Sequence, residues 1–135
     1  MALQYSVTVR NAKLDAVETA IGTSAVLKIR SGSAPSDCAA ADSGTVLATI
    51  TLPSDWMAAA SSGSKAKSGT WQDTSADATG TAGHFRLYAS DGTTCHAQGT
   101  VTATGGGGDL TLDNTSIASG QSVTISSFTL TAGNA

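Results

Sequence analysis

The stretch that decides the fold is SAVLKIRSGSAPSDCAAADSGTVLATITLP, residues 24–53. Its first part alternates apolar Ala25, Leu27 and Ile29 with other side chains, which is typical of a strand with one buried face. A segment rich in Gly, Pro, Ser and Asp follows and predicts a loop. TVLATITLP then predicts a second strand, which ends at Pro53. A strand, a polar loop and a strand therefore set the pattern for the chain.

The rest of the chain repeats this pattern of short strands and turns. Strand patterns recur in KSGTWQD, HFRLYAS, CHAQGTVTAT, DLTLDN and SVTISSFTLTA, and DGTT is a hairpin signal. Residues 54–60 predict either a short helical turn or a loop anchored by Trp56. The absence of strand–helix–strand alternation argues against a parallel α/β sheet. About seven or eight short strands predict a mainly β chain, an antiparallel β-sandwich of jelly-roll type.

The first ten residues alternate between apolar and polar side chains. The apolar members are Leu3, Tyr5, Val7 and Val9. This period predicts a strand or an extended arm over Leu3–Arg10, which could add to the sheet edge of a neighbouring molecule.

A different period follows in NAKLDAVETAIG and predicts one short helix. Asn11 is a suitable cap and Gly22 a suitable stop, and the apolar residues between them share one helical face: Leu14, Val17, Ala20 and Ile21. At 135 residues the chain is expected to be one domain. It has an arm and a helix over 1–22 and a sandwich over 23–135.

Composition and charge exclude several function classes. The chain has 7 Lys and Arg against 10 Asp and Glu, a net charge of −3, so we expect no nucleic-acid partner. No apolar run reaches the length of a membrane helix, and we expect no membrane partner. The first residues lack the charged and apolar regions of a signal peptide, which predicts synthesis and folding in a cytoplasm.

No motif in the sequence carries recognisable chemistry. His84 and His96 are the two histidines, and neither stands in a zinc-binding or catalytic spacing. Adjacent Cys95 and His96 would point to opposite faces of a strand. Asp37 and Asp42 match no known calcium loop, and no GxSxG elbow is present. We therefore expect no metal, no cofactor and no catalysis.

Two pairs of residues leave alternatives open. Cys38 and Cys95, 57 positions apart, either pair across a long loop or remain two small thiols. Trp71 lies in a strand pattern and is expected to anchor the core. Trp56 follows LPSD in a loop, and either anchors the core too or packs at a contact with a subunit or partner.

Four consecutive glycines stand at 105–108, in TVTATGGGGDLTLDN. A phosphate-binding loop needs a following Lys and a helix, and the residues that follow here form a strand pattern instead. The segment after the glycines is too short for a second domain, which excludes a linker. The run predicts a pliant loop between two strands, either a free tip or a place where another backbone approaches closely.

The block from GTSAVLKIR to HFRLY (residues 22–88), with GTTCHAQGTVTATGGGGDLTLDN and the ending SFTLTAGNA, resembles small virion structural proteins of tailed bacteriophages and prophages. In size and expected fold the chain is similar to their capsid cement, or decoration, proteins. This resemblance implies a protein on the capsid exterior that binds the phage major capsid protein and stabilises the shell without catalysis. A homo-oligomer, with a trimer favoured, would suit threefold lattice points.

The candidate interface under this hypothesis consists of the N-terminal residues and one tryptophan. They are Leu3, Tyr5, Val7, Val9, Arg10 and Trp56. The basic residues Arg10, Lys13, Lys28 and Arg30 either face an acidic capsid surface or are ordinary solvated charges. Two alternatives are a tail, neck or fibre component of a virion, and a carbohydrate-binding β-sandwich module.

Overall fold

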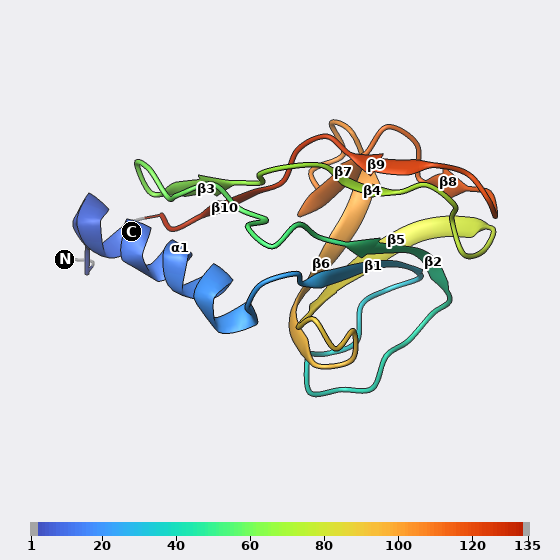
Figure 1. Cartoon of the computed structure of the whole chain (residues 1–135), viewed down its shortest axis with the longest axis horizontal. Coiled ribbons are helices and arrows are strands. Elements are labelled where there is room, and N and C mark those ends of the chain that lie inside the picture. Colours follow the sequence, from blue (N-terminus) through green and yellow to red (C-terminus); the bar gives the residue numbers. More distant parts are fainter. Residues whose placement is uncertain (1–2, 134–135) are drawn as a thin grey trace.

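The computed structural model describes residues 3–133, which are mainly β with one helix (Figure 1). The helix is α1 (Val7–Ile21). The strands are β1 (Val26–Ser31), β2 (Val46–Thr51), β3 (Ser64–Ala66), β4 (Trp71–Asp73), β5 (Gly80–Tyr88), β6 (Cys95–Ala103), β7 (Leu110–Leu112), β8 (Ser116–Ile117), β9 (Val123–Ile125) and β10 (Thr129–Thr131). All the predicted strand regions after residue 23 contain strands. Two strands, β3 and β8, were not expected, and the final predicted strand is divided into β9 and β10.

The main sheet is curled and open, with the strand order β2-β1-β5-β6-β7 and with β8 paired to the start of β5. Two separate ladders, β4–β9 and β3–β10, complete the strand pairing of the described residues. The expectation of a purely antiparallel arrangement is wrong at one place, because β6 and β7 are parallel, with Val101 opposite Leu110. The coarser prediction of a mainly β chain with one short helix is confirmed.

The parallel strands β6 and β7 are joined by residues 104–109 alone. Neighbouring parallel strands ordinarily need a crossover of about a dozen residues or more. The glycine run explains how the shorter connection is possible. Gly105 and Gly107 have φ angles of 87° and 81°, a region that favours glycine. A Cβ at Gly106 would lie 2.8 Å from the hydroxyl oxygen of Thr102, so the loop packs closely against β6 and leaves no room for a side chain at this position. The loop prediction is confirmed, with the close approach made by the chain's own backbone.

The helix begins earlier than predicted. The Ser6 side chain caps it by accepting a hydrogen bond from the Val9 backbone N–H at 3.2 Å, and the helix ends at Gly22, as expected. Residues 7–10, predicted as part of a strand or extended arm, are therefore helical. The alternating pattern of Leu3–Arg10 is overridden because helical geometry aims Arg10 at the carbonyl of Ala132 and Asn11 at the Gly63 N–H, just before β3.

The apolar face of the main sheet is covered by an aromatic cluster. Trp71 of β4 lies 5.5 Å, ring centre to ring centre, from Phe128, and Phe128 lies 5.8 Å from Phe85 of β5. Trp56 is 6.0 Å from Trp71 and is also completely buried. The core prediction for Trp71 is confirmed. Residues 54–60 form the loop alternative rather than a helical turn, with Trp56 as its anchor.

The opposite face of the main sheet is covered by the β1–β2 loop (residues 32–45), which passes below the sheet in Figure 1. Strand pairing places Lys28, Arg86 and Gln98 in one row across β1, β5 and β6 on this face. Arg86 is 2% exposed. Both faces of the central strands are therefore buried, one beneath aromatic rings and the other beneath a polar loop.

Candidate functional site

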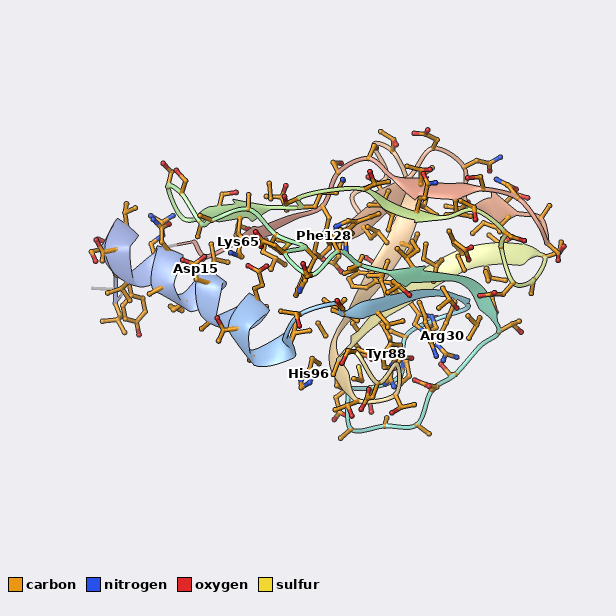
Figure 2. All side chains as sticks on the ribbon, in the orientation of Figure 1. Asp15, Arg30, Lys65, Tyr88, His96 and Phe128 are labelled. Atoms are coloured by element: carbon orange, nitrogen blue, oxygen red, sulfur yellow. The ribbon has the colours of Figure 1, made fainter. Side chains whose placement is uncertain are left out.

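The inward face of α1 carries charge and is fixed by one buried lysine. Lys65 of β3 is 2% exposed, and its ammonium group donates to Asp15 Oδ1 at 2.7 Å and lies 3.0 Å from Glu18 Oε1. Figure 2 shows Asp15 and Lys65 close together between the helix and β3. Hydrogen bonds from Lys65 and from the Ala60 N–H hold the pKa of Asp15 below its usual value.

Further polar contacts attach the same helical face to the chain around β3. Asn11 Oδ1 accepts a hydrogen bond from the Gly63 N–H at 2.9 Å, and Glu18 accepts one from the Met57 N–H at 3.2 Å. Arg10 Nε donates to the carbonyl of Ala132 at 2.6 Å, which attaches α1 to the C-terminal segment. The candidate interface residue Arg10 is thus engaged within its own chain.

The outward face of α1 is rich in apolar residues, with Thr8, Lys13 and Thr19 exposed among them, which departs from the usual polar outer face of a surface helix. Leu3 is 73% exposed, and Val7 is 49% exposed. The exposed apolar residues of α1 and of the segment before it are Leu3, Tyr5, Val7, Val9, Ala12, Ala16, Val17 and Ala20. We call this set the outer α1 surface. Of the predicted apolar face of Leu14, Val17, Ala20 and Ile21, only Leu14 and Ile21 are buried.

A groove extends the outer α1 surface toward the sheet. Its volume is about 390 Å³, and its lining includes Val17 of α1, Ala97 of β6 and Leu130 of β10. Phe128 lies at its base together with Phe85. The groove therefore continues from the helix into the β part of the molecule with a mixed lining, in which Gln98, Asp109, Thr129 and Thr131 are polar.

A polar network on the loop-covered face of the sheet centres on Asp42. Its carboxylate accepts hydrogen bonds from Arg86 Nη1 at 2.7 Å, Tyr88 Oη at 2.7 Å and Arg30 Nη2 at 3.0 Å. Burial opposes ionisation of Asp42, but the hydrogen bonds from Tyr88 and Arg86 outweigh it and hold the Asp42 pKa below its usual value. This network binds the β1–β2 loop to β1 and β5.

The predicted basic patch is not assembled. Arg30 is 6% exposed and is used in the Asp42 network, so it is not available to an acidic partner. Lys28 lies over the ring of Tyr88 at 5.1 Å, and Lys13 lies over Tyr5 at 4.5 Å.

The tryptophan of the candidate interface and the two histidines do not assemble into a site. Trp56 is fully buried, and its indole Nε1 donates to the Gly22 carbonyl at 2.9 Å, so it takes the core alternative and not the contact alternative for which it was included in the candidate interface. His84 is buried, with Nδ1 2.8 Å from the Gly32 carbonyl, whereas His96 is exposed. Within residues 3–133, no group of three or more His, Cys, Asp and Glu side chains could hold a metal ion.

Cys38 of the β1–β2 loop and Cys95 at the start of β6 lie together. Their sulfur atoms are 2.7 Å apart, and both thiols are free. Burial and the neighbouring Cys38 raise the pKa of Cys95 to about 12.

Sequence reasoning missed the role of Asp42 as a centre of charge and that of Lys65 as an anchor for α1. A signal existed for one partner, since Arg86 stands in the otherwise strand-like HFRLY with apolar residues on both sides.

No family model, no curated protein and no solved structure matches the chain. Among the described residues there is no helix long and apolar enough to cross a membrane.

Proposed function

We propose that this chain is a non-catalytic structural protein of a phage virion, a decoration protein that binds the outside of the assembled capsid. The observation that carries the proposal is the outer α1 surface. Asp15 and Glu18 of α1 hold the helix against β3 through Lys65, and most of the large side chains exposed on and before the helix are apolar, with Lys13 as the exposed charge among them. Such a surface is stabilised when a partner covers it.

The partner in this proposal is the phage major capsid protein, with the chain itself as a homotrimer at threefold lattice points. Contact occurs through helical packing, because residues 7–10 are helical and do not add to a neighbour's sheet as a strand. A protein that binds only the assembled lattice stabilises it by mass action and needs no catalytic group. The proposal includes a sandwich-like fold, in which the β4–β9 ladder forms part of a second layer over the main sheet.

The structure gives less support to a carbohydrate-binding module. Such modules commonly stack sugar rings on exposed aromatic side chains, and five of the six aromatic residues here are buried in the chain: Trp56, Trp71, Phe85, Tyr88 and Phe128. Tyr5, which is 41% exposed, belongs to the outer α1 surface. A tail or neck component would use the same surface, and the number of copies per virion distinguishes it from a capsid component.

The test is quantitative mass spectrometry of virions purified from the host that encodes the chain. The proposal expects on the order of hundreds of copies per particle, because a trimer would occupy many equivalent points of the capsid lattice. About a dozen copies or fewer would assign the chain to the tail or neck, and its absence from virions would reject the proposal.

A pair of variants tests the outer α1 surface directly. Ala16→Glu places a charge on the outward face of α1 and is expected to lower incorporation into virions at least about tenfold, because the charge is desolvated in the contact. Thr124→Glu, on an exposed position of β9, is the matched control and is expected to be incorporated normally. Equal incorporation of the two variants, at equal thermal stability, would show that the outer α1 surface is not the contact.

A further inference from the structure

Cys38 and Cys95 are placed together by contacts that do not involve their sulfur atoms. Arg86 Nη2 donates to the carbonyls of Asp37 and Ala40, at 2.8 and 3.1 Å, and so fixes the loop on both sides of Cys38. Cys95 is fixed separately, because it stands opposite Tyr88 in the β5–β6 ladder. The two thiols therefore meet because the loop and the strand are each held in position.

We propose that Cys38 and Cys95 form an oxidant-responsive pair that closes to a disulfide within one chain and locks the β1–β2 loop onto the main sheet. The free sulfur atoms are 2.7 Å apart, and a disulfide bond is about 2.05 Å long. Closure therefore requires only a small movement of two half-buried side chains. The proposal holds for any assembly that the chain joins, and so it is independent of the proposed virion function.

The oxidant is a small disulfide such as oxidised glutathione, and the reaction is thiol–disulfide exchange. One cysteine thiolate attacks the glutathione disulfide, forms a mixed disulfide and releases one glutathione thiolate, which takes up a proton. The second cysteine, after losing its proton, attacks the protein sulfur of the mixed disulfide and displaces the second glutathione. The two thiols lose two electrons and two protons in total, and one glutathione disulfide becomes two glutathione thiols.

The surroundings of the pair set the order of the two steps. Burial and the neighbouring Cys38 raise the pKa of Cys95 to about 12, so Cys95 remains a protonated thiol at neutral pH. The proposal assigns the first attack to Cys38, because burial of Cys95 disfavours its thiolate. Cys95 acts second, when the mixed disulfide is already beside it and the exchange is intramolecular. The charge of Arg86 favours the thiolate of Cys95 in that step.

The experiment incubates the purified full chain with equimolar reduced and oxidised glutathione and then counts thiols with Ellman's reagent after denaturation. We expect the count to fall from two per chain to none, the intact mass to fall by about two hydrogen atoms, and the chain to remain a single chain on a non-reducing gel. Two remaining thiols, or disulfide-linked dimers in place of the closed monomer, would overturn the proposal.

Two single variants test the order of the steps. Cys95→Ser is expected to accumulate a glutathione adduct on Cys38, because the resolving thiol is missing. Cys38→Ser is expected to form the adduct on Cys95 more slowly at neutral pH, because burial, the largest cause, still raises the pKa of Cys95 when Cys38 is replaced, and the rate should rise as the pH is raised. Equal adduct rates in the two variants would contradict the assigned order.

The wild-type chain alone provides a further measurement that does not depend on how well the variants fold. Oxidation is expected to raise the melting temperature by roughly 10 °C, because the bond closes a long loop in the unfolded chain. Addition of a reductant should reverse the shift. A closed disulfide that leaves the melting temperature unchanged or lowers it would show that the bond does not lock the native loop.

Discussion

The two faces of the main sheet are buried to a similar degree but by opposite chemistry. On one face Trp71 and Phe128 cover Phe85, with all three side chains at most 6% exposed. On the other face Arg86 is 2% exposed and is satisfied by the Asp42 carboxylate and by carbonyls of the β1–β2 loop. Two equally buried faces therefore need not tolerate amino-acid substitutions equally well.

The difference lies in how each face depends on its partners. Apolar burial is non-directional, so its stabilisation follows the area removed from water and the quality of packing. A buried guanidinium instead requires acceptors at fixed positions, and the loop supplies them through Asp42, Asp37 and Ala40. The polar face thus stabilises one conformation of the loop, and the apolar face stabilises the sheet itself.

The largest expected effect is on the apolar face. Trp71→Ala removes a fully buried ring that contacts Trp56 and Phe128, and it is expected to lower the free energy of unfolding by about 3–5 kcal/mol. Urea denaturation of the purified chain measures this change. Trp71→Phe retains a ring in the cluster and should lose clearly less. A loss below about 1 kcal/mol for Trp71→Ala would show that the cluster is not the centre of the core.

A smaller loss is expected on the polar face. Asp42→Ala leaves two buried arginines without their carboxylate, at a cost of about 2 kcal/mol, reduced because the Asp42 side chain is 39% exposed. Urea denaturation is the measurement, and Asp113→Ala, at an exposed aspartate, is the control with a change within about 0.5 kcal/mol. If both variants lost the same free energy of unfolding, the Asp42 network would not stabilise the fold, and the β1–β2 loop would only cover the sheet.

The smallest effect is the acid dependence of the polar face. The pKa of Asp42 is lower in the folded chain than in the unfolded chain, so its stabilising contribution is complete above about pH 4 and is lost as the pH falls through the folded value. The melting temperature should therefore decrease below about pH 4, and the decrease should be shallower in Asp42→Ala. Part of the decrease remains in the variant, because the pKa values of Asp15 and Asp91 are also lowered, that of Asp91 to about 2. Identical pH profiles for the two chains would contradict the role of Asp42.

The alternation of apolar and polar residues predicts part of the fold. The outer α1 surface shows where this alternation is insufficient. Alternation around Leu27 and Phe85 predicted β1 and β5 because a strand with a buried face has a period of two residues. The same alternation at Leu3–Arg10 predicted a strand wrongly. There the Ser6 cap and the contacts of Arg10 and Asn11 favour a helix, and those contacts join segments far apart in the chain. The sequence predicted the helical form of the outer α1 surface from residue 11 onward, but not that of residues 7–10.

The sequence by itself determined the mainly β class, most strand positions, the end of the helix at Gly22 and the turn-forming nature of the glycine run, because each depends on residues close together in the chain. Only the tertiary structure decided that Arg30 and Arg86 meet at Asp42, that Trp56 is internal and that Cys38 meets Cys95. These outcomes depend on which distant segments pack together. Strand order and loop placement determine that packing, and local periodicity carries no information about either.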